Sequence, residues 1–146
     1  MTKKLFFVLL FMATAMLGQA QVEKMIGQWN TYDDNTGDMR STVRIYEENG
    51  IYQAEIITLY EKDTNGKYKV MTAPYPKEYE GVVGTKLFSE MMIHGDHLKG
   101  KIYDPESQKT YHAKVTYHAK NNELIVRGSL DKAGLLGRSQ TWKQKK

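Results

Sequence analysis

The sequence offers few side chains that could bind a metal ion or carry out catalysis. Its four histidines lie between residues 94 and 118. His94 and His97 flank Gly95-Asp96, a turn dipeptide, so their imidazoles would face each other across the first pair of a hairpin. Imidazole suits zinc, copper and nickel, which makes this pair a candidate metal site. Two ligands do not complete a coordination sphere, and a solvated hairpin tip is the simpler interpretation.

Catalytic groups are equally sparse. The chain has no Gly-x-Ser-x-Gly nucleophile motif, and no serine is backed by an identifiable base. The stretch from Asp33 to Asp38 has the composition of a calcium loop but lacks the spacing and the bidentate glutamate of an EF-hand. Carboxylates in turns usually bind the backbone of the turn. The sequence therefore favours a protein that is not an enzyme and holds no cofactor.

Composition excludes further classes. There is no cysteine, which excludes disulfides, cysteine-ligated metals and thiol nucleophiles. Stability must come from packing, for which ten tyrosines, four phenylalanines and two tryptophans supply large side chains. The formal net charge is +4, and apart from the tail 143–146 the cations are scattered. A scattered excess is a solvated surface, so we expect no nucleic-acid partner.

Residues 1–20 have the three parts of a secretory signal peptide. Lys3-Lys4 gives a cationic start, the run from Leu5 to Leu17 carries no charge, and small residues stand at Gly18 and Ala20. A transmembrane helix would need about 20 apolar residues, and glutamines end the run before that length. We therefore expect no transmembrane helix, export to the periplasm or the extracellular space, and a single mature domain of residues 21–146.

The mature chain alternates apolar and polar residues, and turn dipeptides interrupt the alternation at short intervals. This pattern predicts strands at residues 26–32, 39–48, 51–60, 85–94, 97–104, 109–120, 123–130 and 137–144. We predict an all-β, antiparallel, up-and-down meander of about eight strands that closes into a barrel or a flattened barrel. A two-sheet sandwich is the alternative. The segment 61–84 does not fit the meander, and its tyrosines indicate that part of it packs.

Each turn predicts a register, because a slip of one residue would move every side chain to the other face of the sheet. A two-residue loop at Asn49-Gly50 places Val43 opposite Ile56 on an apolar face and Arg44 opposite Glu55 on the other. The corresponding pairs elsewhere are Met91–Gly100 for the turn at Gly95-Asp96, Ile102–Tyr111 for a loop at 105–108, and Tyr117–Val126 for a turn at Asn121-Asn122. Phe88 then falls on the outer face, opposite Tyr103.

The apolar face of this meander contains side chains that could line a ligand site. They are Tyr52, Met91, Tyr111, Tyr117 and Trp142. An eight-stranded barrel is near the size at which side chains either fill the interior or leave room for one small ligand. These residues would suit a filled core equally well.

Several motifs extend this picture. They are Gly27-Gln28-Trp29, Glu47-Glu48-Asn49-Gly50, the stretch from Gly100 to Pro105, the stretch from Leu124 to Gly128, and the stretch from Leu136 to Trp142. With them the chain resembles, over roughly Ile26 to Trp142, the bacterial exported family catalogued as domain of unknown function 2147. The resemblance implies secretion and a small β fold, and it implies no activity.

The chain departs from that family in two places. Many members carry a cysteine pair in the central loop, and 61–84 has none, so no redox or metal role of that loop is carried over. Gln108 stands where members have a glycine. Gly27-Gln28-Trp29 and an arginine on the last strand also resemble the lipocalin-like barrels. That resemblance implies that Arg138 packs over Trp29 and closes one barrel end, a contact of about 0.5–2 kcal/mol.

Two functions are compatible with the sequence. The first is an exported barrel that binds a small apolar or amphipathic ligand. The second is a filled barrel whose loops bind another protein or a glycan of the cell envelope.

The signal peptide generates a direct prediction: the exported protein begins at Gln21, because cleavage after Ala20 follows the small residues of the leader. N-terminal sequencing of protein recovered from the exporting host measures this. A chain that still begins at Met1 would contradict it.

Overall fold

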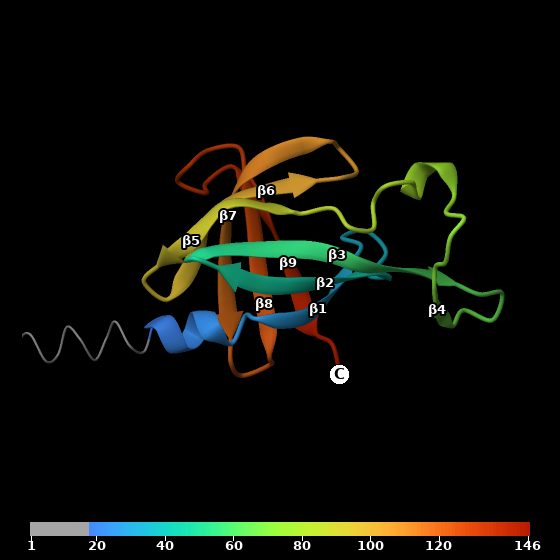
Figure 1. Ribbon diagram of the computed structural model, residues 1–146, viewed down its shortest axis with the longest axis horizontal. Helices are drawn as coiled ribbons and strands as arrows, with labels where there is room; N and C mark the ends of the chain where they lie inside the picture. Colours follow the sequence, from blue (N-terminus) through green and yellow to red (C-terminus); the bar gives the residue numbers. More distant parts are fainter. Residues whose placement is uncertain (1–17) are drawn as a thin grey trace, which may run out of the picture.

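Eight strands follow one another around a closed ring, and the last strand pairs with the first (Figure 1). The computed structural model describes residues 18–146. The ring consists of β1 (Gly27–Tyr32), β2 (Met39–Glu48), β3 (Ile51–Lys62), β5 (Phe88–His94), β6 (His97–Asp104), β7 (Lys109–His118), β8 (Glu123–Ser129) and β9 (Gly137–Gln144). Outside it lie the short strand β4 (Tyr68–Val70) and the 3-10 helix η1 (Lys77–Tyr79). The predicted antiparallel, up-and-down barrel is confirmed, and the sandwich alternative is wrong, because β1 pairs with both β2 and β9.

The hairpin at Asn49-Gly50 has the predicted register. Both turn residues have positive φ, 54° and 82°, as a tight hairpin turn requires. Val43 pairs with Ile56 and Arg44 with Glu55, and the charged groups of the second pair approach to 3.8 Å. Both charged side chains are partly exposed, so this ion pair contributes about 0.2–1 kcal/mol.

The turn after β7 is longer than predicted. Tyr117 pairs with Leu124 rather than with Val126, and residues 119–122 form the loop. The predicted two-residue turn at Asn121-Asn122 is therefore wrong. Because the slip is two residues and strand alternation has a period of two, every side chain keeps its predicted face.

A β-bulge in β5 turns Phe88 into the barrel. Close to the Gly95-Asp96 turn the register is as predicted, but beyond the bulge Phe88 pairs with Ile102 instead of Tyr103. Glu90 lies at the bulge with a φ of 53°. The extra residue reverses the faces of the strand before it. Phe88 is 3% exposed, so its predicted outward position is wrong.

Gly100 of β6 makes room for this bulge. A Cβ at residue 100 would lie 2.6 Å from the carbonyl oxygen of Glu90 and 2.7 Å from the Cα of Met91. The predicted neighbours Met91 and Gly100 do meet, but as a backbone contact. The close approach of β5 to β6 therefore depends on the missing side chain.

One end of the barrel is closed by the segment before β1. Residues 18–23 are helical, and Val22 and Met25 are fully buried in the core. The indole Nε1 of Trp29 donates a 2.8 Å hydrogen bond to the carbonyl of Met25. In Figure 1 this blue helical turn lies beside the hairpin that joins β5 and β6. The predicted signal peptide lies mostly outside the described residues, and cleavage after Ala20 would leave Val22 and Met25 in place.

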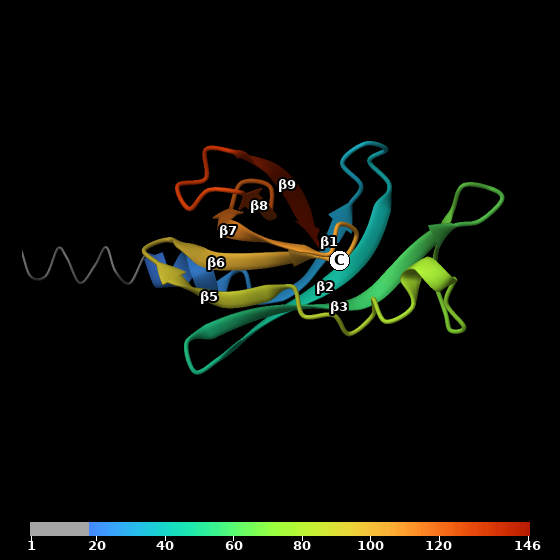
Figure 2. The same ribbon diagram turned by 90° about the horizontal axis from the view of Figure 1, so that it is seen from above.

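Residues 61–84 form an arm on the β3 side of the barrel (Figure 2). The far end of β3 pairs with β4. Lys62 Nζ lies 2.6 Å from Asp38 Oδ1, and the Tyr68 hydroxyl donates to the same oxygen at 3.1 Å. These contacts tie the arm to the β1–β2 loop. Met71 is buried against the core, so part of the segment packs, as expected.

Gly100→Ala should destabilise the barrel by about 1–3 kcal/mol, because the added methyl group cannot avoid the backbone of Glu90. Gly128→Ala is the matched control, since its Cβ would lie 3.7 Å from the nearest side-chain atoms, those of Ile102 and Tyr111, an ordinary contact. Urea unfolding followed by tryptophan fluorescence measures both variants. Equal unfolding midpoints would show that the bulge does not need a glycine opposite it.

Candidate ligand-binding site

An aromatic pair crosses the interior of the barrel. Trp142 of β9 and Phe88 of β5 stack with ring centroids 6.2 Å apart and planes 6° from parallel. β5 and β9 stand on opposite walls, since four steps around the ring separate them in either direction. The pair therefore divides the interior into a half toward the closed end and a half toward the open end.

The half toward the closed end is filled. Trp29 and Tyr117 meet edge to face with centroids 6.4 Å apart, and the Tyr117 hydroxyl donates a 2.7 Å hydrogen bond to Asn122 Oδ1. Tyr52 is 5% exposed and Met91 is fully buried. Burial, and then the charges of two nearby glutamates, raise the pKa of the Tyr52 hydroxyl. These side chains pack together in the core.

Polar side chains line the barrel on the other side of the aromatic pair. Gln140 Oε1 accepts a 3.4 Å hydrogen bond from Trp142 Nε1, and Gln140 Nε2 donates a 3.1 Å bond to Asp34 Oδ2. The Nε of Arg138 lies 3.6 Å from the same carboxylate oxygen. A chain of polar contacts thus runs from a buried indole to an exposed guanidinium at the rim.

A hollow of about 300 Å³ lies beside this chain, between the β1–β2 loop and β9. Its lining consists of Tyr32, Asp33, Asp34, Gly37, Gln140, Thr141 and Lys143. The ladder between β1 and β9 has two cross-strand pairs, Trp29–Gln144 and Asn30–Lys143. Lys143 and Thr141, which line the hollow, alternate with the buried Trp142 and therefore lie on the outer face of β9. Its volume is at the lower limit of small-molecule sites. Carboxylates and an amine at its edge would suit a polar head group.

Asp33 holds the loop that frames this hollow. One of its carboxylate oxygens accepts the backbone N–H groups of Asn35 and Thr36 at 2.8 and 2.9 Å, and the other lies 2.7 Å from Arg40 Nη1. The N–H groups of Thr36 and Asn35, and then the charge of Arg40, lower the pKa of Asp33. The Asp33 carboxylate is thus bound by the protein itself, as expected for a turn rather than a calcium loop.

A second hollow of about 230 Å³ lies near the ends of β6, β7 and β8. It is lined by Lys101, Thr110, Tyr111, His112, Ser129 and Leu130. Both hollows are open to solvent.

The five side chains predicted to line a ligand site lie at different depths in the barrel. Tyr52 and Tyr117 belong to the filled half, Met91 packs in the core, Trp142 forms the dividing pair, and Tyr111 reaches the second hollow. The structure does not bring all five into one pocket. Their role in ligand binding stays a prediction.

Trp29 and Arg138 do not form the predicted barrel-closing pair. Trp29 lies opposite Gln144 of β9, six residues from Arg138, which is about 20 Å along a strand. The Arg138 side chain is 75% exposed and faces Asp34. The prediction was wrong because β1 and β9 are antiparallel, so the start of β1 meets the end of β9 and not its beginning. The predicted inward position of Trp142 is confirmed, since it is 2% exposed.

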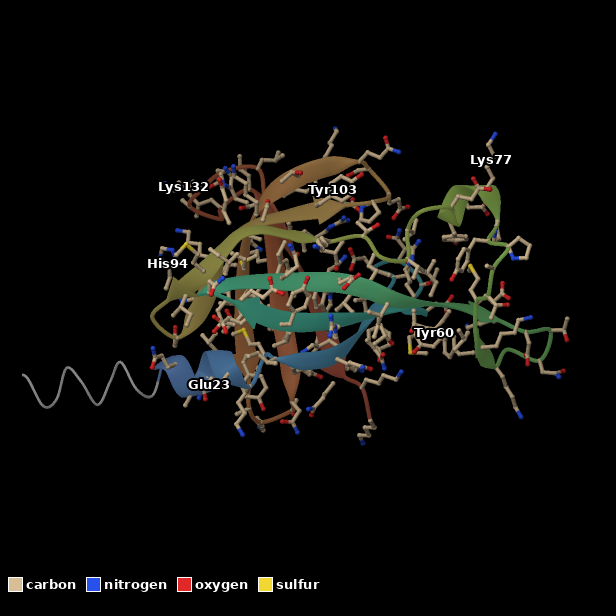
Figure 3. All side chains as sticks on the ribbon, viewed as in Figure 1. Glu23, Tyr60, Lys77, His94, Tyr103 and Lys132 are labelled. Atoms are coloured by element: carbon tan, nitrogen blue, oxygen red, sulfur yellow. The ribbon has the colours of Figure 1, made fainter. Side chains whose placement is uncertain are left out.

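His94 and His97 pair across their hairpin as predicted, with ring centroids 6.4 Å apart. His97 Nδ1 lies 3.0 Å from Asp96 Oδ1. Figure 3 shows His94 at the outer edge of the molecule. Among residues 18–146, no group of three or more histidine, aspartate and glutamate side chains is placed to hold a metal ion. Within the same range, no helix has the length and apolar character needed to cross a bilayer.

Three residues of the dividing pair and of the open half were missed in the sequence. Phe88 was hidden by the bulge, which reversed its face. Gln140 stands two residues before Trp142 and so shares its inner face, a signal that strand alternation offered. Asp34 belongs to a loop, where alternation says nothing about direction.

The closed, antiparallel ring of eight strands defines a lipocalin-like fold. Residues 27–144 match the family described as uncharacterized protein conserved in bacteria (DUF2147), and the chain belongs to that family. It is similar to a solved structure described as protein HP1028 from the human pathogen Helicobacter pylori, which belongs to the lipocalin family. The two are 26% identical with a TM-score of 0.59, over 84% of this chain and 83% of that chain. A search of curated proteins found no match.

The corrected position of Arg138 generates a prediction. Arg138→Lys should change the free energy of unfolding by less than about 0.5 kcal/mol, because an exposed ion pair contributes little. Trp29→Ala should cost about 3–5 kcal/mol, as expected for a buried tryptophan. Urea unfolding of both variants measures the contrast. A strongly destabilised Arg138→Lys would restore a structural role for the arginine.

Proposed function

We propose that this protein is exported and binds one small amphipathic molecule at the open end of its barrel. One observation carries the proposal: the barrel is asymmetric about the Trp142–Phe88 pair. The closed half is filled by side chains and covered by Val22 and Met25. The open half has a polar rim, and a hollow between the β1–β2 loop and β9 reaches that rim at Gln140 and Asp34.

The contacts indicate the chemistry of the molecule. Asp34 is shared by Gln140 and Arg138, and Lys143 Nζ lies 5.3 Å from the centroid of the Tyr32 ring at the edge of the hollow. This rim offers donors and acceptors to a polar head group. A head group that takes over the hydrogen bonds of Gln140 gains access to the aromatic surface of Trp142, which suits an apolar tail.

The family and the structural relative support a binding role. The solved relative is described as a lipocalin family member, and barrels of eight strands can hold one small ligand. Export is supported by the cationic start and the uncharged run of residues 1–20.

A second candidate is a filled barrel that binds another protein or a glycan of the envelope. The observation that favours it is the arm, where Tyr68 and Val70 are 42% and 55% exposed. The Tyr68 hydroxyl, however, is occupied by Asp38 and by the backbone N–H of Met39. Since these contacts tie the arm to the barrel, we prefer the open end as the binding site.

A matched pair of variants tests the proposal. Thr141 and Thr110 are both exposed strand residues, and they line the first and the second hollow respectively. Native mass spectrometry of protein from the exporting host should show a retained small molecule. Thr141→Trp should reduce the retained fraction about tenfold or more by filling the first hollow, whereas Thr110→Trp should leave it unchanged. Absence of any adduct from the wild-type protein, or equal retention by both variants, would contradict binding at this site.

A further inference from the structure

The loop between β8 and β9, residues 130–136, exposes three leucines. Leu130, Leu135 and Leu136 are 72%, 80% and 67% exposed, the highest values among the large apolar side chains of the described residues. Single exposed leucines are common on protein surfaces, but three on one seven-residue loop are not. Contiguous apolar patches on a soluble protein mark surfaces that meet a partner or a membrane.

The loop is ordered rather than loose. Both oxygens of the Asp131 carboxylate accept backbone N–H groups, from Leu135 at 3.0 Å and from Leu136 at 2.7 Å. The N–H of Leu130 donates to the carbonyl of Leu136 at 2.9 Å, and Arg127 Nε donates to the carbonyl of Gly134 at 2.7 Å. The hydrogen bonds of this loop therefore hold the three leucines in outward positions.

These bonds also satisfy backbone groups on both sides of the loop. The carbonyls of Asp131, Gly134, Leu135 and Leu136 and the N–H groups of Leu130, Gly134, Leu135 and Leu136 all have partners within the loop or on Arg127 and Ser129. The side chains of Leu135 and Leu136 therefore extend from backbone whose own hydrogen bonds are already made.

The charges around the leucines are mostly positive. Residues 127–138 contain Arg127, Lys132 and Arg138 against a single acid, Asp131. Arg138 lies beside Asp34 of the β1–β2 loop, and the Asp131 carboxylate is turned toward the backbone of its own loop. Figure 3 shows Lys132 at the outer margin of the molecule. Cations beside exposed apolar side chains complement a surface of anionic lipid head groups.

We propose that the β8–β9 loop inserts its leucines into the surface of a bilayer that carries anionic lipids. A protein partner fits less well, because stable interfaces bury about 800 Å² on each side and their strongest contacts are enriched in tryptophan, tyrosine and arginine rather than leucine. The proposal shares with the proposed function only the export of the chain, and it does not depend on the ligand site.

The test uses the protein as processed by the exporting host, so that the apolar leader does not bind lipid itself. Partitioning is measured by flotation with vesicles of phosphatidylethanolamine and phosphatidylglycerol, and with vesicles of phosphatidylcholine alone. Leu135→Ser combined with Leu136→Ser should lower partitioning about tenfold or more, and Lys132→Gln about fivefold at low salt. Ile51→Ser is the control, since Ile51 is 42% exposed on the β2–β3 hairpin at the other end, and it should change partitioning less than about twofold.

A second measurement tests directly whether the β8–β9 loop contacts lipid. The chain has no cysteine, so Ala133→Cys can carry a single polarity-sensitive dye, with Ile51→Cys as the matched site. Anionic vesicles should shift the emission at residue 133 and not at residue 51. The proposal is overturned if wild-type protein does not float with vesicles, if the double serine variant floats equally, or if the dye at 133 responds to envelope proteins but not to lipid. Ligand retention by the double serine variant, measured by mass spectrometry, should stay unchanged, which separates this outcome from failure of the ligand site.

Discussion

The contact between Gly100 and the bulge in β5 is the constraint on which the interior of the barrel depends. Because residue 100 has no side chain, the backbone of Glu90 and Met91 can pack directly against the backbone of β6. The bulge then reverses the face of the strand before it and turns Phe88 inward. Phe88 in turn meets Trp142 from the opposite wall. The lack of a side chain at Gly100 therefore permits the bulge that turns Phe88 inward. Phe88 and Trp142 together form the boundary between the filled half and the open half of the barrel.

Turn chemistry made most of the fold predictable from the sequence. The dipeptide Asn49-Gly50 predicted a register that the structure reproduces from Val43 to the turn, since positive φ at both residues permits one kind of turn. The bulge could not be predicted, because Glu90 adopts a φ of 53° although its residue type carries no signal for that conformation. The error was confined to the residues on the far side of the bulge, where Phe88 changed face.

The candidate site was less predictable than the fold. The alternation of apolar and polar residues identified the inner face of the strands correctly, including Trp142. It does not say how deep in the barrel each inner residue lies, and that depth decides which residues can contact a ligand. Asp34 acts from a loop, where no periodicity applies. The predicted Trp29–Arg138 pair was wrong because it ignored the direction of the last strand. In an antiparallel ring the start of β1 lies beside Gln144 at the end of β9. The resemblance of Gly27-Gln28-Trp29 to the lipocalin-like barrels predicted that Trp29 is buried, but it did not predict which residue lies against it.

The two ends of the barrel owe their order to different interactions. Packing of Val22 and Met25 against the core orders the closed end. At the open end and on the arm, aspartate carboxylates accept hydrogen bonds from the N–H or hydroxyl groups of their own loops, at Asp33, Asp63, Asp104 and Asp131. Such loops hold their shape without an apolar core beneath them, so a hollow can persist there unfilled. A preformed rim reduces the ordering cost that a ligand would otherwise have to offset on binding, which is why the open end is the better place for a site.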